Sequence, residues 1–179
     1  YRDEAFTVPV DAANYTGEPI YCDFDALGYR LPTEGEWEHF CRAGTTGAFS
    51  VDEPNYDGDT CYAFCAPGVL SGLETVAVFC TCDPGRTEVV GSRLENPWGL
   101  FDVLGNVGEL CWDGFDPTAV FGHQPVTDPL GPRIASYQVQ RGGSYLKLAR
   151  TTRLARREGV EPDFISPDRG FRPVRTLTD

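Results

Sequence analysis

The sequence predicts a small α+β domain with little regular secondary structure. One stretch carries a helix start followed by apolar residues at helical spacing, one short apolar run is typical of a strand, and most of the remainder is rich in glycine, proline and aspartate. A chain of 179 residues that is 41% hydrophobic can bury one core and is too short for two. We therefore expect a single domain over residues 1–179.

The N-terminal part, residues 1–27, has Val and Pro punctuation and a Thr-Gly-Glu-Pro turn, which favour extended segments and loops. The sequence starts at Tyr1 and contains no methionine. A translated chain starts with methionine, so we expect a processed mature chain or a piece of a longer protein. Removal of a secretion signal is one explanation, although no charged and apolar leader is present.

The stretch 32–36, PTEGE, predicts a helix start. The hydroxyl of Thr33 can accept the N–H of Glu36, whose carboxylate can reach back to the N–H of Thr33. Three apolar residues then recur on one face, at i, i+3 and i+4: Trp37, Phe40 and Cys41. We expect a helix over residues 34–42. Its acidic first turn suits the helix dipole, so Glu34 and Glu36 are predicted to be structural rather than catalytic.

The stretch from Gly44 to Arg93 is mostly loop, with one apolar run from Thr75 to Cys80 that predicts a strand. The chain has seven cysteines: Cys22, Cys41, Cys61, Cys65, Cys80, Cys82 and Cys111. An exported domain would use such a set as disulfides, with at least one cysteine left over because the number is odd. A four-thiolate zinc site from Cys61, Cys65, Cys80 and Cys82 is the alternative. Structural zinc sites usually have two-residue spacers, so we favour disulfides.

The stretch from Asn96 to Asp113 combines the backbone-breaking pairs Asn-Pro and Gly-Asn with more apolar surface than a surface loop carries, so we expect it to be buried yet irregular. Its carbonyls need partners, and Asp102 and Glu109 place two carboxylates beside them. Calcium takes oxygens of both kinds. A calcium site formed by Asp102, Glu109 and the carbonyls of Gly105 and Val107 is one interpretation. The alternative is that both carboxylates are solvated or accept nearby N–H groups.

The charge and the apolar runs exclude two classes of partner. With 27 acidic and 15 basic residues the net charge is −12, which repels a phosphate backbone, so we expect no nucleic-acid partner. No run approaches the roughly 18 apolar residues of a membrane span. The two histidines, His39 and His123, are far apart in the sequence, and we expect neither to be a ligand or a catalytic base.

Four ordered motifs resemble the formylglycine-generating enzyme family, also called sulfatase-modifying factors. They are GYRLPTEGEWEHFCRAG at 28–44, GLFDVLGNVGELCWD at 99–113, QRGGSY at 140–145 and GFRPVR at 170–175. The resemblance implies a variant of the C-type lectin fold with low regular secondary structure, and an N-terminus that is short relative to the family.

The resemblance also implies two bound calcium ions. One ligand set matches Asp102, Gly105, Val107 and Glu109 residue by residue, so we expect calcium there, whereas the second set has no clear match near residues 60–80. Cys41 and Cys111 lie inside motifs in which cysteine fills the core, so we expect them to be buried thiols.

The C-terminal motif argues against the family's best-known chemistry. Members that oxidise a substrate cysteine bind copper through two cysteines after the R-G-G-S-[WY] motif, because Cu(I) prefers thiolates. Those positions align with Lys147 and Thr152, and no cysteine follows Cys111. We therefore expect no copper and no enzyme activity. Arg141, Arg153 and Arg157 match the family's arginines.

Two other branches of the family offer further comparisons. Sulfoxide formation requires three histidines on an added helical domain, which two scattered histidines do not supply. Other members are display scaffolds, such as the variable proteins of diversity-generating retroelements, in which the surface formed by the C-terminal part binds ligands. The corresponding positions form what we call the C-terminal face: Lys147, Leu148, Arg150, Thr151, Val160, Asp163 and Phe164. An ordinary solvated surface is the alternative. Four arginines here also form a basic stripe that can pair internally or attract an acidic partner: Arg150, Arg153, Arg156 and Arg157.

These observations favour a non-catalytic binding domain, secreted or exposed on a cell surface, whose partner is a protein or another surface ligand. A structural subunit that associates with itself or with other surface proteins is the first alternative. An enzyme with an unrecognised site is the second.

Overall fold

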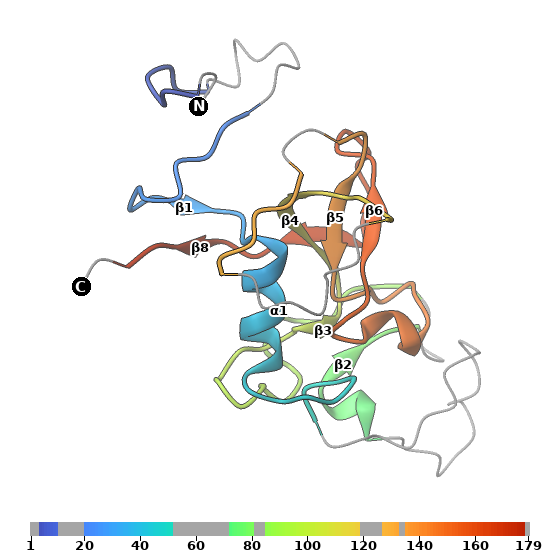
Figure 1. The fold of residues 1–179 in the computed structure, drawn as a ribbon. Helices are drawn as coiled ribbons and strands as arrows, with labels where there is room; N and C mark the ends of the chain where they lie inside the picture. The colour runs from blue at the N-terminus through green and yellow to red at the C-terminus, as the bar shows by residue number, and fades with distance from the viewer. Residues whose placement is uncertain are drawn as a thin grey trace. The chain divides into compact units, whose positions relative to one another are not determined.

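The computed structural model describes residues 4–10, 20–51, 72–80, 85–118, 127–132 and 135–177. The predictions that concern Cys61, Cys65, Cys82 and His123 lie outside these residues. The chain forms two compact units, one from Tyr1–Leu31 with Pro173–Asp179 and the other from Pro32–Arg172 (Figure 1).

The smaller unit pairs the two ends of the chain. Strand β1 (Tyr29–Arg30) lies antiparallel to β8 (Val174–Arg175), with Tyr29 opposite Arg175. The hydroxyl of Thr176 donates to the carbonyl of Phe24 at 2.7 Å, and the Arg30 guanidinium lies 4.7 Å from the centre of the Phe24 ring. The described residues before β1 form turns and irregular backbone, as the sequence predicts.

The larger unit begins with helix α1 (Glu34–Arg42), whose bounds are those predicted. The capping box is present, because Thr33 Oγ1 accepts the N–H of Glu36 at 3.1 Å and Glu36 Oε2 accepts the N–H of Thr33 at 2.8 Å. Ala43 ends the helix in the left-handed conformation. Trp37 and Cys41 are fully buried, so the predicted apolar face is the face that enters the core.

A four-stranded sheet forms the centre of this unit, in the order β6, β5, β4, β7. The strands are β4 (Gly108–Gly114), β5 (Gln138–Arg141), β6 (Glu158–Val160) and β7 (Arg169–Phe171). β5 is antiparallel to β4 and β6, whereas β7 is parallel to β4. Helix α1 packs against β4 and β5 (Figure 1). The core between them includes Leu104, Cys111 and Val139.

Four short elements complete the unit. Strand β2 (Ala77–Val78) lies parallel to β3 (Leu104–Gly105), and two 3-10 turns are η2 (Leu73–Thr75) and η3 (Ala149–Thr152). The low content of regular secondary structure agrees with the predicted fold class.

The predicted strand from Thr75 to Cys80 was too long. Its first residue belongs to η2, and pairing is limited to Ala77–Val78 because β3 ends at Gly105, whose φ is +79°. At the other end, the N–H of Cys80 donates to the carbonyl of Lys147 rather than to a strand.

The prediction for Asn96 to Asp113 was half wrong. The second half is the longest strand of the sheet, β4, because β5 and β7 pair with its two edges. In the first half, Trp98 is 52% exposed and Phe101 is 39% exposed. The irregular backbone here is satisfied by a buried amide instead: Asn96 accepts from the N–H groups of Trp98 and Leu100 and donates to the carbonyl of Phe40.

The described cysteines differ in state. Cys41 and Cys111 are buried thiols, as predicted, and burial raises the pKa of both far above the usual value. Cys80 is disulfide-bonded. No disulfide joins two cysteines that both lie in the described ranges.

Candidate functional site

The predicted calcium ligands surround a tight turn between β3 and β4. Gly105 has a φ of +79°, and a Cβ atom there would lie 1.8 Å from the carbonyl oxygen of Val78, so only glycine fits. Asn106, with a φ of +60°, donates its N–H to that same carbonyl, and its side-chain oxygen accepts the N–H of Glu88. The turn is therefore fixed from both sides, and it sets the position of Val107 and Glu109.

Glu109 lies at the centre of this site. The residue is 5% exposed, and Oε2 accepts from Nε1 of Trp37 at 2.7 Å. Arg172 donates to Oε1 at 2.6 Å and to Oε2 at 3.1 Å. Burial alone lowers the pKa of Arg172, but the Glu109 carboxylate outweighs it, so the pKa is raised. Glu109 is thus a buried, paired carboxylate.

Asp102 joins this cluster through its main chain and has an unpaired oxygen. Its carbonyl accepts from Nη2 of Arg172 at 3.4 Å, and its Oδ2 accepts the N–H of Gly91 at 2.7 Å. Oδ1 is buried without a hydrogen-bond partner in the described structure. A buried carboxylate oxygen without a hydrogen-bond partner is a candidate ligand for a cation. Glu109, which accepts from three donors, still has lone pairs available. Arg172 competes for Glu109, so the ligand set remains a prediction.

The two positions aligned with copper-binding cysteines have other partners. Nζ of Lys147 donates to Oε2 of Glu158 at 2.7 Å. Thr152 is fully buried, and its hydroxyl donates to the carbonyl of Ala149 at 2.8 Å. Both polar groups are therefore engaged in local interactions, and neither offers a soft donor.

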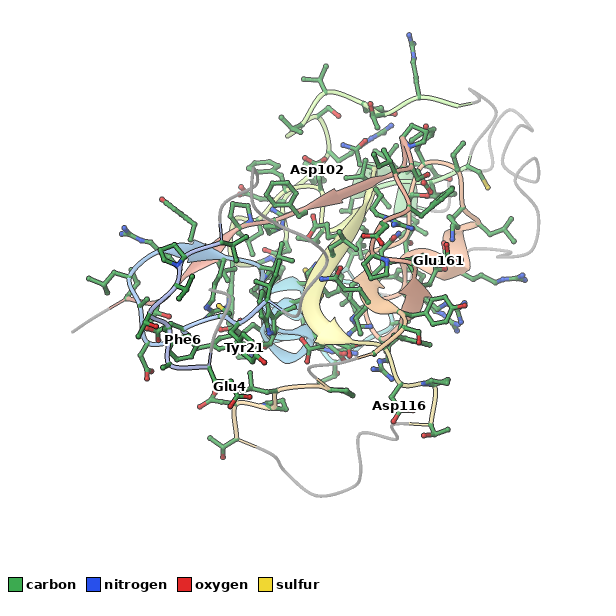
Figure 2. All side chains as sticks on the ribbon, turned by 90° about the horizontal axis from the view of Figure 1, so that it is seen from above. Glu4, Phe6, Tyr21, Asp102, Asp116 and Glu161 are labelled. Carbon is green, nitrogen blue, oxygen red and sulfur yellow. The ribbon has the colours of Figure 1, made fainter. Side chains whose placement is uncertain are left out.

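The residues of the C-terminal face come from three places in the sequence: before β6, at its end and after it. Lys147, Leu148, Arg150 and Thr151 form one continuous stretch that leads into and through η3. Lys147 contacts Glu158 at the start of β6, whereas Val160 at its end pairs with Gln138. Asp163 and Phe164 follow in the connection to β7, and both are exposed. Figure 2 shows Glu161, the first residue of this connection, apart from Asp102. The other end of the C-terminal face lies near the turn, because the N–H of Tyr145 donates to the carbonyl of Asn106 at 3.0 Å.

Sequence reasoning missed a buried ionic cluster around the helix N-terminus. Arg157 binds both oxygens of Glu34, at 2.6 and 2.8 Å, and Glu34 is 3% exposed. Arg141 is fully buried, pairs with Glu38, and lies 3.4 Å from Glu34. The matched arginines at 141 and 157 were a signal of such a cluster, but their partners are more than a hundred residues away in the sequence.

Asp113 ties this cluster to the loop before β5. Its two oxygens accept the N–H groups of Glu34 and Gly131, both at 2.6 Å. Burial raises the pKa of Asp113, although these two N–H groups oppose the shift. The prediction that Glu34 and Glu36 are structural agrees with this geometry, because one fills the ionic cluster and the other closes the capping box.

This arrangement matches a known family. The Sulfatase-modifying factor enzyme 1-like domain family matches residues 5–177. The chain belongs to this family. Three relatives show the range of proteins in which the sulfatase-modifying factor domain occurs. The formylglycine-generating enzyme of Streptomyces coelicolor is 34% identical over 151 residues, which are 81% of this chain and 46% of that enzyme.

The other two relatives are not called formylglycine-generating enzymes. The serine/threonine-protein kinase pkn1 of Chlamydia pneumoniae is 32% identical over 171 residues, 94% of this chain and 24% of the kinase. The structure of Treponema denticola variable protein 1 has a TM-score of 0.72 and 29% identity, and the match covers 92% of this chain and 58% of that one. This sulfatase-modifying factor domain thus spans less than half the length of the two curated relatives. In the described residues, no helix has the length and apolarity needed to cross a membrane.

Proposed function

We propose that this sulfatase-modifying factor domain is a non-catalytic binding domain, secreted or exposed on a cell surface, that binds a protein or another surface ligand through its C-terminal face. The observation that carries the proposal is the chemistry at Lys147 and Thr152. A Cu(I) site needs two soft thiolates in reach of one another. Here one position holds an ammonium group paired with Glu158 and the other a buried hydroxyl that donates to Ala149.

The framework around these positions supports a display role. Arg141 and Arg157 fix the sheet to α1, and Ser144 is fully buried and donates to Asp168. A rigid framework lowers the entropy cost of holding binding residues in place. Exposed side chains then follow from β6 towards β7, including Phe164, which is 58% exposed. The similarity to Treponema denticola variable protein 1 is in keeping with this role. The cysteine content is in keeping with export.

Calcium belongs to the proposal as a structural ion. Asp102, Glu109 and the carbonyls of Gly105 and Val107 would hold it, and its charge would compensate the unpaired Oδ1 of Asp102. These residues would fix the turn before β4 and take no part in chemistry on a bound ligand.

A direct assay tests the absence of catalysis. The purified chain is incubated with copper and a peptide that carries the Cys-x-Pro-x-Arg motif, and the peptide is examined by mass spectrometry. We expect no aldehyde. A parallel sample receives an active formylglycine-generating enzyme, which must convert the same peptide in the same buffer. Detectable aldehyde from the chain alone would contradict the proposal.

A further inference from the structure

An exposed basic surface overlaps the C-terminal face at Lys147. Five of the chain's 15 basic residues fall between positions 147 and 157, a stretch that contains no acidic residue. In a protein with a net charge of −12, such a local excess of positive charge is paired internally, solvated, or matched by an acidic partner. The structure separates these cases for four of the five: Lys147, Arg153, Arg156 and Arg157. The fifth, Arg150, is exposed, and its carbonyl accepts from Arg153.

Arg157 is accounted for internally. Its guanidinium binds the buried carboxylate of Glu34 through two nitrogens and lies 5.3 Å from the centre of the Phe115 ring. It belongs to the framework, and its side chain is only 18% exposed.

Lys147 and Arg156 share a single carboxylate. Oε2 of Glu158 is 2.7 Å from Nζ of Lys147, and Oε1 is 3.8 Å from Nη2 of Arg156. The Glu158 side chain is 15% exposed, whereas Lys147 is 39% and Arg156 is 48% exposed. The partly buried Glu158 carboxylate thus stands behind two positive charges that face solvent. Lys147 also acts on the Asp168 carboxylate, whose pKa its charge helps to lower.

Arg153 adds a further positive charge on a rigid base. It follows η3 directly, and its Nε donates to the carbonyl of Arg150 at 3.0 Å, which orients the side chain. The residues on both sides of Arg153, Thr152 and Leu154, are fully buried. The Arg153 guanidinium therefore extends from a fixed backbone, so the side chain loses little conformational entropy on binding.

We propose that Lys147, Arg153 and Arg156 dock an acidic segment of a partner protein. Charge complementarity determines the partner's chemistry, because carboxylates form charge-assisted hydrogen bonds with guanidinium and ammonium groups. The net charge of the whole chain does not prevent this, since charges beyond about 8 Å are screened at physiological salt. A nucleic acid is disfavoured, because a long phosphate backbone would also meet the acidic remainder of the surface. The inference rests on the proposed function and gives its partner a chemical class.

The test measures the fluorescence anisotropy of a labelled oligoglutamate peptide against the purified chain, with oligolysine and single-stranded oligothymidylate as comparison probes. We expect binding of oligoglutamate that weakens as salt rises. The double variant Arg153→Gln/Arg156→Gln should lose about tenfold in affinity. The matched control Arg86→Gln/Arg175→Gln removes two exposed arginines elsewhere and should bind as the native chain does.

A second variant reverses the effect. Glu158→Gln removes the carboxylate that competes with the ligand, so oligoglutamate should bind more tightly while melting confirms that the variant is folded. Equal losses in the two double variants, no binding of oligoglutamate, or stronger binding of oligothymidylate would each overturn the proposal. A salt-sensitive dimer seen by light scattering and lost in Arg153→Gln/Arg156→Gln would replace the partner with a second copy of the chain. None of these outcomes bears on catalysis, which only the aldehyde assay tests.

Discussion

Arg156 and Arg157 are neighbours in the sequence, yet the fold gives them opposite surroundings. Arg157 binds a carboxylate that is 3% exposed and closes the ionic cluster at the start of α1. Arg156 is 48% exposed and stands 3.8 Å from a carboxylate that it shares with Lys147. The comparison shows that a basic run in this sequence combines a structural cation with cations that face solvent, and that burial of the opposing carboxylate separates them.

The largest effect is expected when the structural arginine of this pair, Arg157, is replaced. Arg157→Gln leaves the buried Glu34 without its bidentate partner, so the free energy of unfolding in urea should fall by about 3 kcal/mol. Arg156→Gln is the control, and should change it by less than about 0.5 kcal/mol, as is usual for an exposed side chain. Similar losses for both variants would mean that the two arginines are equivalent.

Calcium should have an effect nearly as large on the cluster of Asp102 and Glu109. If calcium binds there, and only to the folded chain, a hundredfold excess over Kd should add about 2.7 kcal/mol to the free energy of unfolding. The melting temperature should therefore drop in chelator, and Glu109→Gln should remove most of that drop by weakening the site. Identical melting curves in calcium and in chelator would end the calcium interpretation.

A smaller effect, with a defined pH dependence, is expected at Ser144. Burial raises the pKa of Asp168, but hydrogen bonds from Ser166 and Ser144 and the charge of Lys147 outweigh it and hold the pKa below its usual value. The stabilisation is therefore full above the unfolded pKa of about 4 and is lost as the pH falls through the lower folded pKa. Ser144→Ala should cost about 1.5 kcal/mol at neutral pH. Urea titrations at about pH 7 and pH 3 should show this cost shrinking in acid, and a cost that is the same at both would contradict the assignment.

The smallest effect is a change in mass. If the domain is exported, the mass measured without reductant should lie about two daltons below the all-thiol value for each disulfide. Cys41 and Cys111 should resist alkylation until the chain is unfolded, since a buried thiol of raised pKa does not form the reactive thiolate. Rapid alkylation of all seven cysteines in the native state would contradict both statements.

Local signals made α1 predictable from the sequence. Its cap, its acidic first turn and its apolar spacing all lie within residues 33–42, so no distant residue was needed to define its bounds. The burial of Cys41 and Cys111 followed from the family motifs in the same way.

The surroundings of Glu109 could not be predicted, because they depend on residues far away in the sequence. Trp37 is 72 residues before it and Arg172 is 63 residues after it, and no spacing rule joins them. β4 was missed for a similar reason, since its regularity comes from edges supplied by β5 and β7 rather than from its own glycine-containing sequence. The motif GNVGEL defines a turn locally, but it does not say which cation meets Glu109.

These long separations also affect how fast the chain can fold. The Glu34–Arg157 pair closes a loop of 123 residues, and the Arg141–Glu38 pair closes one of 103. β7 can pair with β4 only after the chain that follows β6 has crossed β5 and β4 to the other edge of the sheet. Proteins dominated by such non-local contacts fold on a scale of about milliseconds to seconds, because chain entropy is lost before the contacts that repay it form. α1 can form early, but the carboxylate of Glu34 has no arginine partner until Arg141 and Arg157 pack against the helix.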